Sequence, residues 1–282
     1  CSKISGNYNN CDIYFSEKID GVWGDIESLS DKICPKYSWE SQPSLSSDGK
    51  TLFFASDRDG GYGGIDLYKI TKNYLGVWGE PVNLGPNINS PNNEKSPFIH
   101  PDGKTLYFAS DNFPSLGGYD IFISKKDSLN IWQKSKNIGF PINTSFNEIS
   151  LFVTTDGKKA IFASNNLEGI GGWDMYSFDL YDDIQPERVL FLKGDIYDEQ
   201  GKIIKDIEIE IKNLKTQEIK KIKVNDGNYA ASLTLSQYDD VLITIKKKGY
   251  AFNSQYISYN DTSFYSPKKL DFEIKDIEEG ES

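Results

Sequence analysis

The residues with the clearest chemical potential are aspartates that recur at a fixed interval. Each is followed by an apolar residue and an aromatic ring, and successive copies stand 54 residues apart: Asp12, Asp66, Asp120 and Asp174. Carboxylates can act as general acids and bases or bind calcium. Because each repeat unit carries only one copy, the aspartates are spread through the fold rather than gathered. We therefore expect each carboxylate to accept hydrogen bonds from amides of its own loop.

Three other aspartates flank glycine-rich loops and are the alternative candidates for a calcium site: Asp57, Asp59 and Asp111. Their spacing does not match the oxygen ligands of an EF-hand loop. Zinc would need partners that the cysteines and a single histidine, His100, do not supply at the usual spacing. The sequence predicts no metal and no cofactor.

Paired glycines precede three of the repeated aspartates, at positions 63–64, 117–118 and 171–172. Glycine-rich loops cradle phosphate when a helix follows, because the helix N-terminus holds the anion. A strand is expected after each pair here. We therefore predict that the glycines permit a positive φ or a close contact between neighbouring repeat units.

His100 is the only histidine, so a Ser-His-Asp or Cys-His arrangement would have to include it. Its equivalents at the repeat interval are Ser46 and Thr154, just before Asp-Gly turns. A position that accepts Ser, His and Thr is typical of an exposed turn. No Gly-x-Ser-x-Gly elbow occurs either, and we predict that the chain is not an enzyme.

The three cysteines align with apolar or small residues at the repeat interval: Cys1 with Ala55, Cys11 with Ile65 and Cys34 with Ile88. Buried thiols are therefore expected. In an oxidising compartment, a Cys1–Cys11 disulfide and a Cys11–Cys34 disulfide are the two alternatives, and the sequence does not choose between them. A lipidated Cys1 at a mature N-terminus is a further alternative.

Tryptophan is the best candidate for a contact residue. Trp23, Trp78 and Trp132 recur near the start of an expected outer strand, where a large ring packs between neighbouring units. Trp173 instead lies beside a repeated aspartate, and its equivalents are Ile65 and Tyr119. We predict that Trp173 is exposed and binds a partner.

These residues belong to a repeat of 54 residues whose landmarks stay in register. Each unit opens on a glutamate, passes an Asp-Gly pair and a Phe-Ala-Ser strand, and reaches the paired glycines. Asp-Gly between two extended stretches predicts a hairpin, a third strand begins at the repeated aspartate, and a fourth follows the tryptophan. Four antiparallel strands per unit are typical of a β-propeller blade.

The units differ in completeness. Units 40–84 and 94–138 contain all expected strands, whereas 148–180 lacks an obvious outer strand and 1–30 holds only the part after a hairpin. Residue 1 aligns with the middle of a second strand. We therefore expect the sequence to be an excerpt that starts within a blade, with further blade residues upstream.

The segments "SSDGKTLFFASDRDGGYGGIDLY" and "HPDGKTLYFASDNFPSLGGYDIF" resemble the blade signature of TolB-type propellers, in the glycine-rich form found beside OmpA-like domains. The resemblance extends over residues 1–182. It implies a partial propeller of four-stranded blades, with loops on two faces available for recognition.

A second domain is expected after a polar linker at 183–188. Alternating apolar and charged residues predict strands at 189–195, 208–212, 219–224, 229–233 and 241–246, which fit a small β-sandwich. The segments "KGDIYDEQGKII", "NDGNYAASL" and "KKGYAF" resemble the carboxypeptidase-regulatory-like module, a transthyretin-like sandwich, over residues 189–275.

The tail "LDFEIKDIEEGES" resembles the strand that enters an OmpA-like peptidoglycan-binding domain, so 276–282 would begin the linker to a domain that this sequence lacks. The order of domains resembles periplasmic OmpA-family proteins of the PorE type, which are associated with type IX secretion and gliding. The resemblance implies a non-enzymatic scaffold of the periplasm, associated with the outer membrane. Its partners would be secretion-system proteins and, through the absent domain, peptidoglycan.

Two alternative functions stay open: a propeller that binds glycans or peptidoglycan fragments, and a propeller that gates an upstream catalytic domain.

The composition argues against other classes of protein. The 31 Lys and Arg against 42 Asp and Glu give a net charge of −11, which argues against binding to the phosphates of nucleic acid. No apolar run approaches the roughly 18 residues of a membrane helix, and residues 1–20 lack the pattern of a signal peptide.

Overall fold

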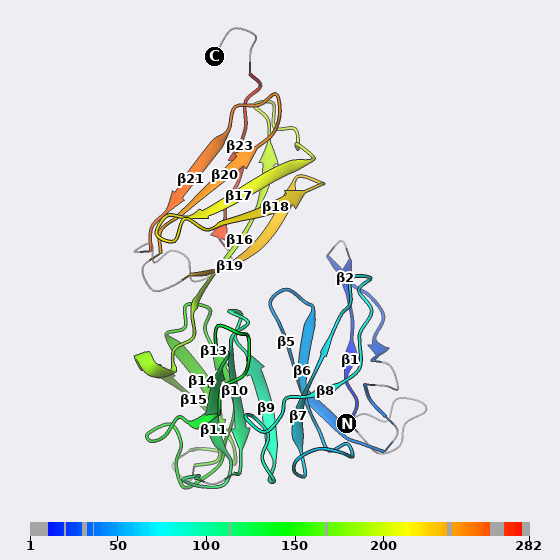
Figure 1. The fold of residues 1–282 in the computed structure, drawn as a ribbon, viewed down its shortest axis with the longest axis vertical. Helices are drawn as coiled ribbons and strands as arrows, with labels where there is room; N and C mark the ends of the chain where they lie inside the picture. The colour runs from blue at the N-terminus through cyan, green and yellow to red at the C-terminus, as the bar shows by residue number, and fades with distance from the viewer. Residues whose placement is uncertain are drawn as a thin grey trace. The chain divides into compact units, whose positions relative to one another are not determined.

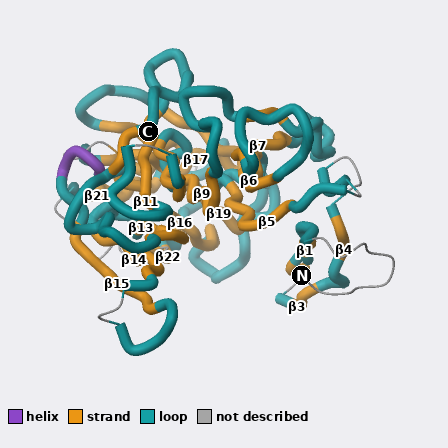
Figure 2. The backbone as a smooth tube through the Cα atoms, turned by 90° about the horizontal axis from the view of Figure 1, so that it is seen from below, coloured by secondary structure: helices purple, strands orange, loops and turns teal. Residues whose placement is uncertain are grey.

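The computed structural model describes residues 11–19, 21–29, 33–35, 37–112, 114–166, 169–235, 239–259 and 268–277. The chain divides into two compact units, Cys1–Pro186 and Glu187–Ser282. Strands carry nearly all regular structure of the described residues, as the orange segments of Figure 2 show. The one helical element among them is a 3-10 turn at Asp182–Ile184. The prediction of an all-β chain is confirmed.

The two complete repeat units each form a four-stranded antiparallel sheet with its strands in chain order (Figure 1). The first sheet contains β5 (Glu40–Leu45), β6 (Thr51–Ser56), β7 (Asp66–Thr71) and β8 (Val82–Asn83). The second contains β9 (Glu94–Ile99), β10 (Thr105–Ser110), β11 (Asp120–Lys125) and β12 (Lys136–Asn137). The short outer strands β8 and β12 follow the tryptophan-bearing segments, as expected.

The third repeat unit forms a three-stranded sheet of β13 (Glu148–Val153), β14 (Lys159–Ser164) and β15 (Asp174–Asp179). Within the described ranges no outer strand pairs with β15. Before β5 lie two small pairs: β1 (Tyr14–Phe15) with β4 (Glu27–Ser28), and β2 (Lys18–Ile19) with β3 (Val22–Trp23).

The first strands of the three larger sheets contain the same irregularity. The ladder shifts register there, and the residues at the shift adopt a left-handed backbone: Gln42 at φ 54°, Ser96 at φ 50° and Ser150 at φ 56°. These residues contact one another, because Ser96 N–H donates to Gln42 Oε1 at 2.8 Å and the hydroxyls of Ser96 and Ser150 lie 3.3 Å apart. The bulges therefore hold β5, β9 and β13 side by side.

Neighbouring sheets share hydrophobic cores. Phe53 and Leu67 of the first sheet belong to one buried cluster with Leu106 and Phe108 of the second. The alternate face of β10 contributes to another cluster, which includes residues of the third sheet such as Leu151. Because β6 and β10 are buried on both faces, they read as nearly continuous apolar runs in the sequence.

Part of the expected linker at 183–188 belongs to the first unit. Ile184 is buried, and its carbonyl accepts a hydrogen bond of 2.5 Å from the Tyr107 hydroxyl. Lys125 Nζ donates to Gln185 O at 2.7 Å, whereas Arg188 already begins a strand of the second unit. The segment is polar apart from Ile184, and for that reason its sequence was interpreted as a linker.

The second unit consists of two sheets that share one hydrophobic core. One sheet contains β16 (Arg188–Tyr197), β19 (Asn228–Leu235), β22 (Lys268–Lys269) and β23 (Phe272–Glu273). The other contains β17 (Ile207–Asn213), β18 (Ile219–Val224), β20 (Val241–Lys246) and β21 (Asn253–Ile257). All five strands expected from the alternation are present; β21 and β22 were not expected, and β23 lies in the tail where an entry strand was expected.

The start of the tail is a strand of this unit. Phe272 and Ile274 are fully buried in its core, and β23 pairs in parallel with β16. The first part of the segment that resembles an entry strand thus packs in the core of the second unit. Residues 278–282, which complete the expected linker, lie outside the described residues.

Candidate functional site

The repeated aspartates accept hydrogen bonds from their own loops, as predicted. Asp66 Oδ2 accepts from Tyr62 N–H at 2.5 Å and Oδ1 accepts from Gly63 N–H at 3.1 Å. Asp120 Oδ2 accepts from Leu116 N–H at 2.6 Å. These carboxylates order the loop before the third strand of each sheet.

The aspartates also hold the outer strand. Asn83 Nδ2 donates to Asp66 Oδ2 at 2.8 Å, and Asn137 Nδ2 donates to Asp120 Oδ2 at 2.7 Å. In each sheet the asparagine belongs to the outer strand and stands 17 positions after the aspartate. The aspartate therefore links its loop to the sheet's outer edge.

A second asparagine, which is buried, forms hydrogen bonds with the same edge. Asn89 Oδ1 accepts from Leu67 N–H at 2.8 Å while its Nδ2 donates to Leu67 O at 3.0 Å. Asn143 makes the same pair of bonds to Ile121, at 2.8 and 2.9 Å. One side chain thus satisfies both backbone groups of an edge residue, as a neighbouring strand would. We call these asparagine pairs the outer clamps: Asn83 with Asn89, and Asn137 with Asn143.

The third sheet has the edge without a clamp. Met175 stands where Leu67 and Ile121 stand, but its side chain is 79% exposed whereas theirs are 0% exposed. Asp174 is half-buried, whereas Asp66 and Asp120 are buried. Within the described part of the chain, no residue takes the place of the clamp asparagines. We call the outer side of Asp174–Asp179, together with Trp173, the open edge.

Trp173 immediately precedes β15 and is 51% exposed. Its neighbour Ile170 is fully exposed, and Gly171 N–H donates to Asp174 Oδ2 at 3.0 Å, which fixes the loop between them. The exposure predicted for Trp173 is confirmed, and its role in binding stays a prediction. The sequence indicated that this unit lacks an outer strand, but it did not indicate that Met175 and the resulting edge lie in the same site as Trp173.

The other tryptophans follow the prediction only in part. Trp132 is buried and meets Phe53 of the preceding sheet edge to face, with ring centroids 6.2 Å apart. Trp78 is half-buried against a further cluster, which includes Leu52 and Phe54 of its own sheet. Trp23 is 67% exposed, so the expected core packing is wrong for this residue. Its unit lacks a described preceding sheet to pack against.

The exposed turn expected at His100 is wrong. The imidazole is fully buried, with Nε2 3.2 Å from Thr154 O and Nδ1 accepting from Asp102 N–H at 3.2 Å. Burial would raise the pKa of Asp102, but the contact with His100 and the hydrogen bonds from Lys104 N–H and the Thr105 hydroxyl together outweigh it and lower that pKa. The ring reaches the neighbouring sheet, which the shorter side chains of Ser46 and Thr154 do not. His100 is therefore a packing residue between sheets.

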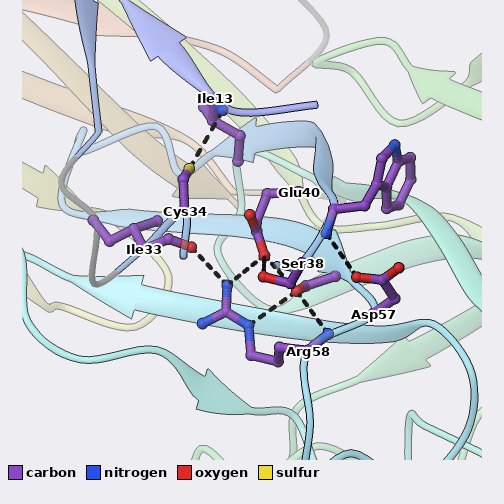
Figure 3. A network of polar contacts seen from close by, with 9 residues as sticks. Ile13, Ile33, Cys34, Ser38, Glu40, Asp57 and Arg58 are labelled. Atoms are coloured by element: carbon purple, nitrogen blue, oxygen red, sulfur yellow. Dashed lines mark hydrogen bonds and ion pairs between the residues drawn. The ribbon is translucent and has the colours of Figure 1, made fainter. Parts of the chain in front are cut away.

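A buried glutamate begins each of the three larger sheets, and Figure 3 shows the first of them. Glu40 Oε1 accepts hydrogen bonds from the hydroxyls of Ser38 and Ser56, at 2.6 and 2.7 Å, and pairs with Arg58 at 3.1 Å. Glu94 Oε1 likewise accepts from the hydroxyls of Ser90 and Ser110. Burial raises the pKa of Glu40 and of Glu94.

Cys34 takes the place of a clamp asparagine rather than of Ile88, which the repeat interval had suggested. Ile13 N–H donates to Cys34 Sγ at 3.4 Å, and Ile13 stands 54 residues before Leu67 (Figure 3). The thiol is buried and free, and burial raises its pKa to about 11. Cys11 is disulfide-bonded, so the Cys11–Cys34 alternative is wrong. Cys1 lies outside the described residues.

Asp12, Cys34 and Glu40 bring potential metal ligands within 4.8 Å of one another, although their sequence spacing did not suggest it. The fit to a cation is poor. The thiol holds its proton at neutral pH, and the Arg58 guanidinium already neutralises Glu40. The other two units place an aspartate, a clamp asparagine and a glutamate at the equivalent positions. We therefore read the cluster as the repeat's framework with a cysteine in it.

The alternative calcium ligands also have structural roles. Asp57 Oδ1 accepts from Trp39 N–H at 2.6 Å, and Asp111 Oδ1 accepts from Asn93 N–H at 2.8 Å. Asp59 is exposed. The first two carboxylates fix the residue that leads into the glutamate of each sheet.

Two of the three glycine pairs, at positions 63–64 and 117–118, make the close contact between units that the sequence predicted, whereas the pair at 171–172 does not. Gly64 N–H donates to Asn92 O at 2.9 Å, and Gly118 N–H donates to Phe146 O at 2.8 Å. A Cβ on Gly63 would overlap Asn92 O, and one on Gly117 would overlap Phe146 O. These loops contact the next unit.

No family model matches the chain, and no curated protein matches it either. Among solved structures, the chain is similar to TolB from Acinetobacter baumannii, with 14% identity, a TM-score of 0.39, and coverage of 88% of this chain and 46% of that one. Smaller matches include 3-chlorocatechol 1,2-dioxygenase from Rhodococcus opacus 1CP, at 10% identity and a TM-score of 0.26 over 34% of this chain and 62% of that one. Catechol 1,2-dioxygenase from Pseudomonas arvilla C-1 matches at 14% identity and a TM-score of 0.27, over 34% of this chain and 55% of that one.

The chain thus spans less than two thirds of each of these structures. Likenesses at these TM-scores carry no argument about activity. In the described ranges, no helix has the length and apolarity to pass through a lipid bilayer.

Proposed function

We propose that this chain is a non-enzymatic, protein-binding module of a bacterial cell-envelope scaffold. The observation that carries the proposal is the open edge, where a strand without an outer neighbour among the described residues lies beside exposed Trp173 and Met175. Exposed strand edges are ready sites for pairing with another chain. The buried carboxylates with known partners serve the sheets themselves, which favours binding over catalysis.

In this proposal the first unit is part of a TolB-type β-propeller. The 54-residue repeat, the antiparallel sheets and the adjacent first strands β5, β9 and β13 support that architecture. Propellers typically have 4–8 blades, so the described sheets would form an arc of the ring. The second unit would be a carboxypeptidase-regulatory-like sandwich, which its two facing sheets support.

The proposed location is the periplasm, in association with the outer membrane. It rests on the resemblance of the quoted segments to OmpA-family proteins of the PorE type. There the module would bind secretion-system proteins, and an OmpA-like domain outside this sequence would hold peptidoglycan.

The experiment is affinity capture from cross-linked cell envelopes with the full-length parent protein. We expect specific envelope proteins to be retained, and their yield to fall when Trp173 is replaced by Ala. Trp23→Ala is the matched control, because that ring is also exposed but lies far from β15 in the sequence. Recovery of no envelope protein, or equal loss in both variants, would contradict the proposal.

Binding of glycans or peptidoglycan fragments is the second candidate, favoured by the half-exposed ring of Trp173. Aromatic rings can stack on sugars. Calorimetry with soluble muropeptides separates the two functions. Heat of binding that disappears in Trp173→Ala but not in Trp23→Ala would support the glycan function. If the unaltered chain gives no heat of binding, the glycan function is excluded.

A further inference from the structure

We propose that the open edge of β15 binds an extended segment of a partner polypeptide, which pairs antiparallel to β15 and carries two clamp asparagines. This deepens the proposed protein-binding function, on which it rests, by naming the kind of segment that is bound. The inference follows from the two sheets in which the chain itself fills the equivalent edge.

The two outer clamps define the pattern of the segment. Residues 83–89 read Asn-Leu-Gly-Pro-Asn-Ile-Asn, and residues 137–143 read Asn-Ile-Gly-Phe-Pro-Ile-Asn. The shared pattern is Asn, an apolar residue, Gly, two variable residues, Ile and Asn. Ile88 and Ile142 are buried, so the apolar residue before the second asparagine also anchors the segment.

The edge of β15 offers the same acceptors and donors as the filled edges. β11 pairs with β12 so that Phe122 opposes Asn137 and Ile123 opposes Lys136. Carried over by the repeat interval, this register places the first clamp asparagine opposite Tyr176, within reach of the Asp174 carboxylate. The second asparagine would bond to the backbone N–H and C=O of Met175, as Asn143 does to Ile121.

Charge favours a segment that carries lysine. The open edge bears two carboxylates, Asp174 and Asp179, and Asp179 is exposed. The 134–145 sequence contains Lys134 and Lys136, whereas the 80–91 sequence contains Glu80 and no lysine. Opposite charges on neighbouring strands are favourable, and like charges are unfavourable. The 134–145 sequence therefore suits the open edge better than the 80–91 sequence.

The source of the segment is a different polypeptide rather than a second copy of this chain. Both copies of the pattern in the chain are already bound within their own sheets, through Asn89 on Leu67 and Asn143 on Ile121. A second copy could donate either segment only by opening a sheet of its own.

The test uses the 282-residue chain and a fluorescein-labelled peptide with the sequence of Lys134–Ser145, followed by fluorescence anisotropy. We expect saturable binding that weakens at least about tenfold when both clamp asparagines of the peptide, Asn137 and Asn143, are replaced by Ala, because several hydrogen bonds are lost. The Glu80–Pro91 peptide keeps the clamp but reverses the charge, and we expect it to bind more weakly at low salt.

The matched chain variants are Met175→Pro and Met175→Ala. Proline removes the outward N–H at an edge position that tolerates it, whereas alanine keeps that N–H. We expect Met175→Pro to abolish binding and Met175→Ala to weaken it only a few-fold, with circular dichroism unchanged. Equal affinity of the native and asparagine-free peptides, or full binding by Met175→Pro, overturns the inference.

A photo-crosslinker at position 175 of the full-length parent protein, in its own cells, identifies the source. Cross-links to an Asn-bearing segment of another polypeptide support the inference, whereas links to a second copy or to the same polypeptide overturn it. Envelope partners that are captured equally well by Met175→Pro would overturn the edge as the binding site but leave the scaffold function standing. Capture of no partner would count against the scaffold function itself.

Discussion

At the scale of single residues, one position explains both the buried cysteine and the open edge. A strand residue after the repeated aspartate presents its N–H and C=O outward in each unit. An asparagine satisfies both groups at Leu67 and Ile121, whereas the Cys34 thiol offers Ile13 one weak contact at 3.4 Å. At Met175 the described residues supply neither. The clamp side chain thus adds to the backbone hydrogen bonds that Leu84, Ile138 and Leu29 donate to the carbonyls of the same three strand residues.

Replacing Cys34 by Asn is therefore expected to stabilise the first unit. The new amide can bond to both backbone groups of Ile13, which contributes about 1 kcal/mol and raises Tm by roughly 2–4 °C. Thermal unfolding followed by circular dichroism measures the shift. Asn89→Cys is the reciprocal control and should lower Tm; an unchanged or lower Tm for Cys34→Asn would show that the pocket does not accept the amide.

The same thiol gives a pH dependence with a defined sign. Burial raises the pKa of Cys34 to about 11, whereas an unfolded chain releases this proton near pH 9. Between these values the unfolded state holds fewer protons than the folded state, so stability falls as pH rises. At pH 10 the loss is about 1 kcal/mol relative to pH 8.

Urea unfolding at both pH values, compared with Cys34→Ala, isolates this contribution. We expect the decrease from pH 8 to pH 10 to be smaller in the variant. Iodoacetamide should also label Cys34 at pH 8 only after unfolding. Rapid labelling of the native chain would contradict the buried, protonated thiol.

At the scale of elements, the loops before the third strands connect successive sheets. The loop of the second unit places Gly117 against Phe146 O and Thr144 O of the third, so no side chain fits there. In the third unit the equivalent Gly171 has Trp173 O as its nearest such neighbour, at 3.6 Å. The Gly-Gly pair therefore packs against a neighbouring unit in the second unit but not in the third.

Gly117→Ala and Gly171→Ala form a matched pair. We expect Gly117→Ala to destabilise the first unit by more than about 2 kcal/mol, because its Cβ must displace backbone of the next unit. Gly171→Ala should cost less than about 1 kcal/mol. Denaturant midpoints of both variants measure the difference, and similar midpoints would refute the close contact.

At the scale of the whole molecule, the two units have separate cores. The second unit buries its own cluster, to which β16, β17, β20 and β23 all contribute. Ile184 and Gln185 make their hydrogen bonds with Tyr107 and Lys125, which belong to the first unit. We therefore expect each unit to unfold as its own cooperative transition.

Residues 187–282 expressed alone should fold. The expected outcome is a cooperative thermal transition and dispersed amide resonances, because all strands of both sheets and their shared core are retained. The fragment 183–282, which adds the anchoring segment of the first unit, should melt at the same temperature. A non-cooperative melt of 187–282 would show that the division at Pro186 is misplaced.

Much of this protein follows from the sequence because its information is periodic. Alternating apolar residues, Asp-Gly turns and a 54-residue interval indicate the strands, their order and the missing outer strand after β15. The exposure of Trp173 follows from the same interval. Each of these depends on local patterns, which a linear sequence contains.

Only the tertiary structure decided which distant side chains meet. It buried His100 between two sheets, placed Cys34 at a clamp position one residue away from its sequence alignment, and anchored Ile184 under Tyr107. It also exposed Met175 beside Trp173, because no outer segment among the described residues covers this position. Contacts of this kind are set by the packing of neighbouring sheets, and a repeat interval does not specify them.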